Sequence, residues 1–332
     1  GGALGIPLAL VAGMVVSGAS FGDKMSPVSD TTNLAAMVAD TDLYSHIKSM
    51  LYTTVPTYII SLIAFTLVGL YYSGQTLSAQ ELLTLSQHLE IEFAISPLTL
   101  LPLIVLLALS LKRTAAEVSM LASVVTAVML AVATQDRTFT EVLNSLYTGY
   151  VADTGLEQLD TLLSRGGITS MMSTMSLALI ALSLGGILDR AGFVRVLLSG
   201  VLKRIKRSAS LMATTIGTGV VANMSMGEGY LSIIFGGQIF KDSFEEDRLE
   251  KHMLSRCLEE GATLSTSLIP WTTSGAFITG VLGMSPLEFA PWAFFNYINP
   301  LLSIGLAYMG FGIFRQQGFE TPRGTPLSSL KK

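Results

Sequence analysis

The fold is decided by the stretch Ser17-Gly18-Ala19-Ser20-Phe21-Gly22-Asp23-Lys24-Met25-Ser26-Pro27-Val28-Ser29-Asp30-Thr31-Thr32-Asn33-Leu34-Ala35. It places three charges, a proline and a run of hydroxyl side chains directly after an apolar segment. The hydrocarbon core of a membrane holds no water, so uncovered backbone groups and ionised side chains persist there only where they line a cavity or bind something. The stretch therefore predicts a helix that is broken inside a membrane.

The composition agrees with a chain that is surrounded by lipid. Half of the 332 residues are hydrophobic and only 13% are charged, against roughly 25% in an average soluble domain; the mean hydropathy is +0.57. The net charge of −4 comes without a basic patch interleaved with aromatic residues, so nothing indicates nucleic-acid binding. The single cysteine, Cys257, excludes an intramolecular disulfide, and His46, His88 and His252 lack the spacing of metal ligands. We expect no cofactor.

About 20 apolar residues cross a bilayer core as a helix, and this length identifies the membrane spans. Five continuous spans are predicted, over residues 50–72, 91–111, 116–134, 171–188 and 291–314. Residues 73–90 and 135–167 contain few or no basic residues and are predicted as outside loops, whereas Lys112-Arg113, the basic segment 190–207 and the tail 316–332 are predicted to be cytoplasmic. The expected fold class is an all-α polytopic membrane protein.

Residues 209–240 must begin and end on the same side if these assignments hold. Their two apolar halves, 209–222 and 230–240, would be roughly 21 Å and 17 Å long as helices, each too short to cross. A re-entrant hairpin with a glycine-rich tip at residues 223–229 is therefore predicted, and one long kinked crossing is the alternative. Residues 241–256 mix charged and apolar residues, as an amphipathic helix in the membrane interface does.

An internal repeat links the two halves of the chain. Sliding the sequence on itself by 243 residues sets Gly18 on Gly261 and Pro27 on Pro270, and each window has half a helix, a hydroxyl-rich stretch around the proline and then resumed apolar sequence. Corresponding interrupted segments in two halves indicate the binding site of a secondary transporter. Cytoplasmic loops carry an excess of Lys and Arg, and this rule orients the two copies oppositely in the membrane. The pattern predicts an inverted repeat with discontinuous helices.

This repeat sets the expected domain organisation. Residues 1–315 form a single membrane transport domain: 1–72 end the first repeat and contain the broken helix 3–35, 91–134 are linking spans, and 169–315 are the second repeat with the hairpin 209–240 and the broken helix 257–283. The hairpin needs a counterpart before residue 1, so we expect the sequence to be truncated at its N-terminus.

A helix interrupted inside the membrane leaves unpaired carbonyls on one stub and unpaired amides on the other, each end carrying about half an elementary charge. Carbonyls, hydroxyls and carboxylates are ligands that small hard cations prefer. We predict that ion binding and proton coupling use Asp23, Lys24, Ser26, Ser29, Asp30, Thr31, Thr32 and Asn33 at the first break, and Asn223, Glu228, Glu260, Thr266, Thr272, Thr273 and Ser274 in the second half. Asp23 and Asp30 are predicted to bind the transported sodium ion, and Glu259 is a further candidate carboxylate.

A carboxylate at such a site can exchange a proton for a cation. Burial raises the pKa of a carboxyl group and a nearby cation lowers it, and this competition together with alternating access is sufficient for antiport. Two simpler interpretations stay open. Lys24 and Asp30 form a charge pair that lets the break exist, or Glu259 and Glu260 only cap a helix at the membrane surface.

A nucleophile-elbow pattern at residues 18–22 does not indicate an enzyme. The pattern, Gly18-Ala19-Ser20-Phe21-Gly22, requires a preceding strand, and here a membrane helix precedes it. We therefore predict that the chain is not an enzyme.

The string from Gly22 to Ala35 resembles the signature of the NhaC-type Na+/H+ antiporters, a family of the ion transporter superfamily. The segments Leu184-Gly185-Gly186-Ile187-Leu188-Asp189 and Glu259-Glu260-Gly261-Ala262-Thr263-Leu264-Ser265-Thr266-Ser267-Leu268-Ile269-Pro270-Trp271 are similar to the same family. The resemblance spans residues 1 to about 315. It implies a multi-pass protein of the bacterial inner membrane that exchanges cytoplasmic sodium for external protons and binds its substrate between hairpin tips and broken helices. It also implies membrane lipid, sodium ions and protons as partners, and a homodimer as in many superfamily members.

Some members of the family resemble sodium- and proton-coupled malate/lactate exchangers, and this is the alternative function. A dicarboxylate requires a fixed cation, and Lys24 is the only basic residue expected at a break, with no arginine near either motif. A membrane scaffold or sensor would explain the hydrophobicity but not two polar breaks.

Overall fold

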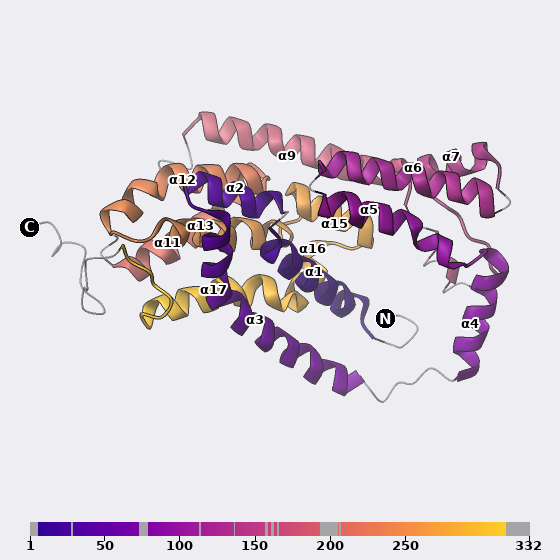
Figure 1. Cartoon of the computed structure of the whole chain (residues 1–332), viewed down its shortest axis with the longest axis horizontal. Helices are drawn as coiled ribbons and strands as arrows, with labels where there is room; N and C mark the ends of the chain where they lie inside the picture. The colour runs from indigo at the N-terminus through magenta and orange to yellow at the C-terminus, as the bar shows by residue number, and fades with distance from the viewer. Residues whose placement is uncertain are drawn as a thin grey trace, which may run out of the picture. The chain divides into compact units, whose positions relative to one another are not determined.

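A computed structural model of the chain describes residues 6–27, 29–72, 79–112, 114–135, 137–156, 159–160, 163–164, 166–192, 205 and 207–316. These residues are almost entirely helical and contain no β-strand; one isolated antiparallel bridge joins Leu249 and Arg315. The all-α fold class is confirmed (Figure 1). The chain divides into two compact units, residues 6–73 with 174–332 and residues 74–173. Residues 3–5 of the predicted broken helix, most of the basic segment 190–207 and the tail from residue 317 lie outside the described residues.

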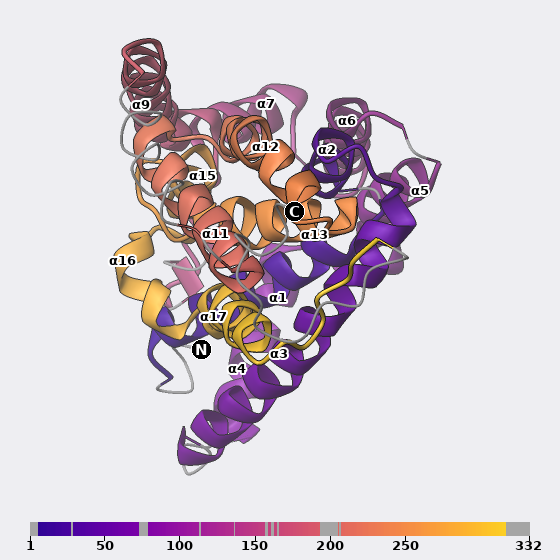
Figure 2. The same ribbon diagram turned by 90° about the vertical axis from the view of Figure 1, so that its left-hand side faces the viewer.

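The larger unit contains the helices that carry both predicted breaks. In chain order these are α1 (Leu8–Met25), α2 (Asp30–Val38), α3 (Leu43–Tyr72), α9 (Met172–Arg190), α11 (Ser208–Met226), α12 (Gly229–Glu246), α13 (Lys251–Leu258), the π-helix η4 (Glu259–Thr263), α14 (Leu264–Thr266), α15 (Thr273–Leu282), α16 (Pro286–Phe289), η5 (Ala290–Trp292) and α17 (Phe294–Tyr308). Helices α11 and α12 pack against each other, and α17 packs against α3 (Figure 2).

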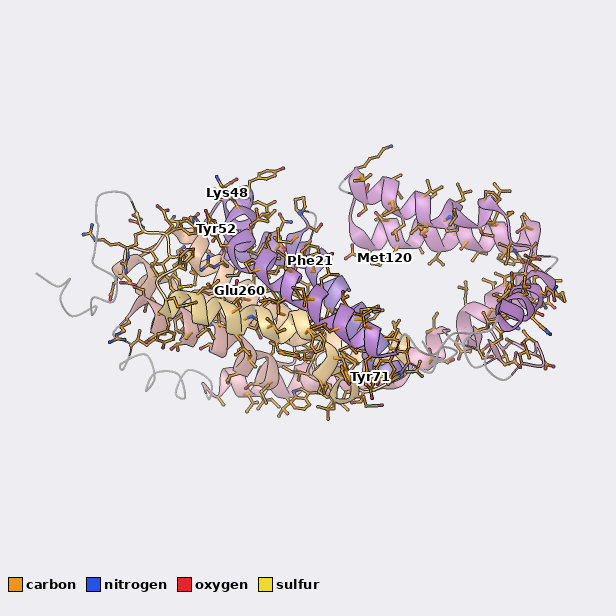
Figure 3. All side chains as sticks on the ribbon, turned by 90° about the horizontal axis from the view of Figure 1, so that it is seen from below. Phe21, Lys48, Tyr52, Tyr71, Met120 and Glu260 are labelled. Carbon is orange, nitrogen blue, oxygen red and sulfur yellow. The ribbon has the colours of Figure 1, made fainter. Side chains whose placement is uncertain are left out.

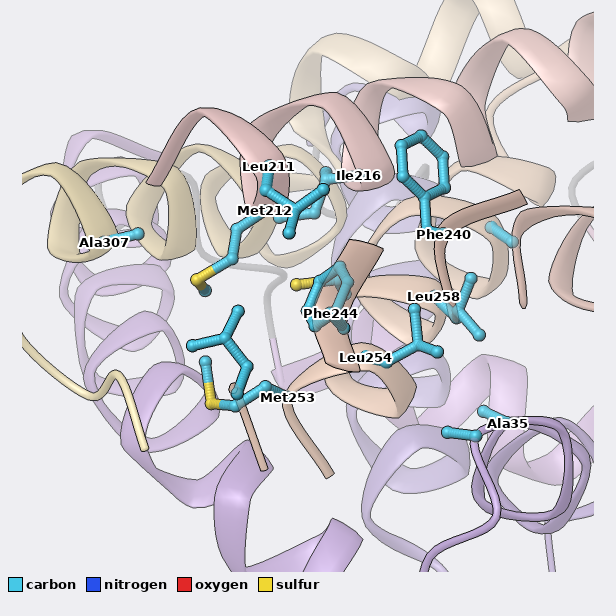
Figure 4. Packing of buried hydrophobic residues seen from close by; sticks show 14 of the residues in the cluster. Ala35, Leu211, Met212, Ile216, Phe240, Phe244, Met253, Leu254, Leu258 and Ala307 are labelled. Atoms are coloured by element: carbon cyan, nitrogen blue, oxygen red, sulfur yellow. The ribbon is translucent and has the colours of Figure 1, made fainter. Parts of the chain in front are cut away.

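The core of this unit lies where α11, α12 and α13 meet. Met212 and Ile216 of α11 are buried together with Phe240 and Phe244 of α12 and Met253 of α13 (Figure 4). Lipid tails are as apolar as these side chains, so close van der Waals packing rather than removal from water holds such helices together.

Large apolar side chains also cover the outside of the larger unit. On α3, Leu62, Ile63, Leu67 and Leu70 are all exposed. Contiguous exposed apolar surface of this kind fits contact with lipid. In the described part of the chain, four helices are long and apolar enough to cross a membrane: Leu8–Met25, Leu43–Tyr72, Glu117–Thr134 and Ile168–Leu188.

The smaller unit contains α4 (Ala79–Glu92), η2 (Pro97–Leu100), α5 (Leu101–Leu111), α6 (Ala116–Thr134), α7 (Phe139–Thr148) and η3 (Ile168–Met171). Helices α5 and α6 pack against each other. The predicted span 116–134 is confirmed as α6. The prediction of one continuous span over residues 91–111 is wrong, because the chain bends by 84° between Ser86–Glu92 and Pro97–Leu111. The first helix ends at Glu92, and Ser96, which precedes a proline, takes an extended backbone directly before the second helix begins.

Two of the other predicted spans lie inside longer helices, and one was drawn too long. Residues 50–72 fall within α3, and 171–188 fall within the segment Ile168–Leu188. The span 291–314 is wrong at both ends, since α17 begins only at Phe294 and ends at Tyr308. Ala293 leaves the helical region before it, and Gly310 takes a positive φ of 75° after it.

Helices α11 and α12 cover the segment predicted as a hairpin and pack against each other, and both are longer than the predicted arms. They are joined by Gly227, which takes the left-handed conformation with φ 70°, and Glu228, whose side chain caps α12. Helix α12 continues to Glu246, and the chain then turns at Arg248, which has φ 54°. The separate interfacial helix predicted for residues 241–256 is therefore wrong.

Candidate functional site at two helix breaks

Each of the two predicted breaks separates a pair of helices and is followed by a capped helix start. Helix α1 ends at Met25, and α2 begins after Ser29, whose side-chain oxygen accepts from Thr32 N at 3.4 Å. Helix α14 ends at Thr266, and α15 begins after Thr272, whose Oγ1 accepts from Gly275 N at 3.1 Å. Each N-cap hydroxyl satisfies an amide that the interrupted helix would leave unpaired.

Between the breaks lies a buried cluster of four charged side chains. Lys24 Nζ is 3.8 Å from Glu260 Oε1, and Arg256 Nε is 4.0 Å from the same oxygen. Thr53 Oγ1 lies 2.5 Å from Glu260 Oε1. Glu259 is the fourth member, and all four charged side chains are at most 1% exposed. Two basic and two acidic side chains are thus buried together, which is favourable only where opposite charges compensate one another.

The geometry of η4 is what turns both glutamates inward. A π-helix inserts an extra residue into a helical turn and often marks a functional site. Glycines let the backbones of η4 and α11 lie in close contact. A Cβ at Gly261 would lie 2.4 Å from the Ile216 carbonyl oxygen, and one at Gly219 would lie 2.7 Å from Ala262 N. Glu260 lies inside this packing, whereas Tyr71 is exposed near the end of α3 (Figure 3).

Glu259 faces the hydroxyl groups of α2. Its Oε1 lies 3.4 Å from Thr31 Oγ1 and 3.3 Å from Thr32 Oγ1. Thr31 Oγ1 is also 3.4 Å from Asp23 Oδ2 and 3.1 Å from Ser29 Oγ. The structure therefore brings four residues of the first break together with a carboxylate of the second half.

The remaining predicted residues of the first break are engaged elsewhere. Asp30 accepts a 2.5 Å hydrogen bond from Tyr230 OH on α12. Asn33 Nδ2 donates to the carbonyl oxygen of Ser29 at 2.6 Å, and the carbonyl oxygen of Ser26 accepts from Ser29 N at 3.1 Å. These contacts shape the break, and Asp30 ties it to the hairpin.

The second break contacts the hairpin tip. Thr273 N donates to the carbonyl oxygen of Gly227 at 3.0 Å, and Thr273 Oγ1 donates to Glu228 Oε2 at 2.6 Å. Thr272 Oγ1 contacts the carbonyl oxygen of Thr266. Glu228 is thus a helix cap that links the tip to α15.

Asn223 and Ser274 complete the predicted set. Asn223 Nδ2 donates to the carbonyl oxygen of Ala262 at 2.6 Å and to Ser265 Oγ at 2.9 Å, so it braces the π-helix from within α11 rather than from the tip. Ser274 lies half-buried in the first turn of α15.

The two simpler interpretations of the charges are both wrong. Lys24 pairs with Glu260 and not with Asp30, whose side chain contacts Tyr230. Glu259 and Glu260 do not cap a helix at the surface, because both are fully buried inside a helix that continues from α13.

Three residues of the site were not predicted from the sequence. Arg256 was assigned to an interfacial segment, and the statement that no arginine lies near either motif is wrong. Its spacing of four residues before Glu260 was a usable signal, since such pairs share a helix face. Thr53 and Tyr230 left no signal, because their contacts join segments far apart in the chain.

Hydroxyl and carboxylate oxygens dominate this site. Among the described residues, no three His, Cys, Asp or Glu side chains converge as a metal site. A cation bound here would depend on hydroxyl oxygens together with one or two carboxylates, a ligand set that suits weakly held hard ions.

Comparison with known proteins gives consistent results. The model of the Na+/H+ antiporter family matches residues 18–311. The Na(+)/H(+) antiporter NhaC of Alkalihalophilus pseudofirmus is 37% identical over 329 residues, which are 98% of this chain and 70% of that protein. NhaC of Bacillus subtilis is 34% identical over 92% of this chain and 68% of its own length. The malate-2H(+)/Na(+)-lactate antiporter of Bacillus subtilis is 33% identical over 93% of this chain and 66% of its own length. No solved structure matches.

Proposed function

Because this chain belongs to the Na+/H+ antiporter family, we propose that it is a secondary active transporter that exports cytoplasmic sodium in exchange for protons by alternating access. The observation that carries this proposal is the buried set of carboxylates and hydroxyls that joins the two helix breaks. A carboxylate in such surroundings is costly to leave ionised and alone, so it holds either a proton or a cation. That competition is the chemistry of antiport.

We further propose that the first break binds the ion, with Asp23, Thr31 and Thr32 nearest to the carboxylate cluster. Asp23 is exposed while the neighbouring Lys24 is buried, so an ion that approaches from outside the fold meets Asp23 first. The second break supplies neutral hydroxyls, and its Thr273 joins it to the hairpin.

Everted membrane vesicles test this function. Vesicles that contain the complete protein should dissipate a pre-formed pH gradient when sodium is added, and Asp23→Asn should abolish the response. Asp242→Asn is the matched control, because Asp242 is an exposed carboxylate on α12 away from both breaks. Lithium and potassium serve as comparison ions. Absence of any sodium response over the whole pH range would refute the proposal.

The two breaks are proposed to be an inverted repeat within one membrane domain, and reciprocal contacts support this. Thr53 on α3 contacts Glu260 in the second broken helix. The same shift of 243 residues carries that pair onto Asn296 and Ser17, and α17 indeed contacts the first broken helix there: Phe295 N donates to Ser17 Oγ at 3.4 Å, and Asn296 Nδ2 donates to Ser20 Oγ at 2.8 Å. Such an exchange of partners is expected for halves related by a pseudo-two-fold axis.

The hairpin of α11 and α12 is proposed to be re-entrant, with both ends cytoplasmic in a bacterial cell (inner) membrane. Its tip contacts the second break through Gly227 and Glu228, as a tip that lines a binding site would. Asp242→Cys tests the orientation, because position 242 is exposed whereas the native Cys257 is buried and gives little background labelling. Labelling from the cytoplasmic side is expected. Labelling exclusively from outside would contradict it.

The malate/lactate alternative is favoured only by the 33% identity to the malate-2H(+)/Na(+)-lactate antiporter. The geometry argues against it, since both buried cations are already engaged. Lys24 and Arg256 face Glu260, and Arg256 Nη1 donates to the carbonyl oxygen of Gly312 at 3.0 Å. Little positive charge is left for a dicarboxylate. Uptake of labelled malate or lactate into proteoliposomes tests this alternative. If neither organic acid is taken up, the alternative is excluded.

A further inference from the structure

The two adjacent glutamates of η4 lie in different environments. Glu260 has two cations within 4.0 Å and a hydroxyl at 2.5 Å. For Glu259, no lysine, arginine or histidine nitrogen lies within 4.0 Å in the part of the chain that the structure describes, and its Oε1 contacts only hydroxyl groups. In both glutamates the second oxygen, Oε2, is buried and has no hydrogen-bond partner among these residues. Glu260 therefore lies within ion-pairing distance of two cations, whereas Glu259 does not.

The oxygens around Glu259 lie close enough together to share one cation. The contacts from Glu259 to Thr31 and Thr32, and from Thr31 to Asp23, measure 3.3–3.4 Å. A hard cation that holds its oxygens at about 2.4 Å in octahedral geometry places neighbouring ligands about 3.4 Å apart.

The end of α1 adds carbonyl oxygens to the same place. Thr32 Oγ1 lies 3.3 Å from the carbonyl oxygen of Lys24 and 3.4 Å from that of Asp23. These carbonyls belong to the last turn of α1, where a helix carries about half a negative charge. The hydroxyls of Thr31 and Thr32 thus link the carboxylates of Glu259 and Asp23 and the negative end of α1.

We propose that Glu259 is the carboxylate that exchanges sodium for a proton, with Asp23, Thr31 and Thr32 as its co-ligands, and that Glu260 is the fixed counter-ion of Lys24 and Arg256. This assignment rests on the proposed function and names the residue that couples the two ions. In the exchange, Glu259 in its acid form loses its proton as sodium binds, and one proton leaves for each sodium ion.

The charge balance of the cluster supports this division of roles. With Asp23 ionised, the protonated form of Glu259 without sodium and the ionised form with sodium give the site the same net charge. Lys24 and Arg256 keep Glu260 as their partner in both forms, so these ion pairs do not change. Exchange at Glu259 therefore avoids the large cost of an uncompensated buried charge in either state.

Sodium binding to the complete purified protein tests the assignment directly. Thermal stabilisation by sodium is measured over a series of pH values, with choline replacing sodium at constant ionic strength. Glu259→Gln keeps the shape of the side chain but should weaken sodium binding at least about tenfold and remove its pH dependence, because a charge-assisted ligand is lost. Asp242→Asn, at an exposed carboxylate of α12, is the matched control and should leave sodium affinity within about threefold of the wild type.

Two variants of Thr32 provide a milder test at the same site. Thr32→Val removes the oxygen next to Glu259 and should weaken sodium binding, whereas Thr32→Ser keeps the oxygen and should preserve it. If Glu259→Gln fails to fold, Glu259→Asp replaces it. The shorter carboxylate should retain pH-dependent binding with reduced affinity, and unchanged affinity would contradict the assignment.

The outcomes separate this inference from the function on which it rests. Wild-type sodium affinity in Glu259→Gln would overturn the inference but leave antiport intact. Sodium binding that stays pH-dependent in Glu259→Gln would also overturn it, because the proton would then be exchanged at another residue. Absence of sodium binding to the wild type would instead count against the proposed function.

Discussion

The contact between α11 and η4 allows a prediction in which two glycines on one helix respond oppositely to the same substitution. A Cβ at Gly219 would lie 2.7 Å from Ala262 N and 2.7 Å from Gly261 C. Ordinary contacts of a Cβ begin at 3.4 Å, so the two backbones must separate by about 0.7 Å. Both atoms are backbone atoms and cannot rotate away. A Cβ at Gly217, two residues earlier, meets nothing within 4 Å.

The expected energies follow from these distances. Replacing glycine by alanine inside a helix stabilises it by roughly 0.5–1 kcal/mol where space is available. Gly217→Ala should therefore be neutral or slightly stabilising. Overpacking costs typically about 1–3 kcal/mol, so Gly219→Ala should be destabilised by about that amount despite the same gain in helix propensity. Displacement of η4 should also move Glu259 and weaken the sodium response.

Thermal unfolding of the two variants, in the same detergent and with and without sodium, measures both effects. Gly217→Ala should unfold at or above the wild-type temperature, and Gly219→Ala clearly below it with a reduced shift on addition of sodium. Equal stability of the two variants would refute the close approach of α11 to η4. A destabilised Gly219→Ala with an undiminished sodium shift would refute the link between this contact and the ion site.

Three further predictions concern the charges and the caps. Glu260→Gln should cost about 3–5 kcal/mol because it leaves the buried Lys24 and Arg256 without their carboxylate, whereas Lys24→Met should cost less because Arg256 still pairs with Glu260. The double variant should cost less than the sum of the two, and additive losses would show that Lys24 and Glu260 are not coupled. Thr272→Val should lose about 0.5–2 kcal/mol of stability with the cap of α15, and Thr272→Ser should retain most of it, as unfolding measurements can check. The Lys251 ammonium beside Asp40, in the turn between α2 and α3, holds the pKa of that carboxyl below its usual range, so the stabilisation is present above about pH 3.9 and is lost as the pH falls through the lowered pKa. The difference in melting temperature between Lys251→Ala and the wild type should therefore disappear in acid, and a difference that persists there would contradict it.

The helix breaks could be predicted because their causes are local. A proline removes a backbone donor and excludes the helical conformation from the residue before it, and a serine or threonine beside it caps the next helix. Pro27 with Ser29 and Pro270 with Thr272 satisfy both conditions within a few residues. The span of α6 was predicted for a similar reason, since its apolar run is bounded by polar residues on both sides.

The wrongly predicted helix ends are set by the backbone conformation of single residues, which a count of apolar residues does not register. Apolar residues run on past Tyr308, but Gly310 ends the helical path there. Lys241 interrupts the apolar run of α12, yet a helix continues through charges until a turn such as that at Arg248 stops it. Hydropathy reports how readily side chains transfer from water to lipid, whereas backbone conformation determines where a helix ends.

The sequence by itself determined that this chain is an all-helical membrane protein with two polar helix breaks, because apolar length, proline and hydroxyl capping act within one or two helical turns. Only the tertiary structure decided which charges meet. It paired Lys24 with Glu260 instead of Asp30, brought Arg256 into the interior, and set Glu259 against the hydroxyls of Thr31 and Thr32. Electrostatic partners are chosen by distance in space, and the contact between Gly219 of α11 and Gly261 of η4 that creates this proximity leaves no pattern along the chain.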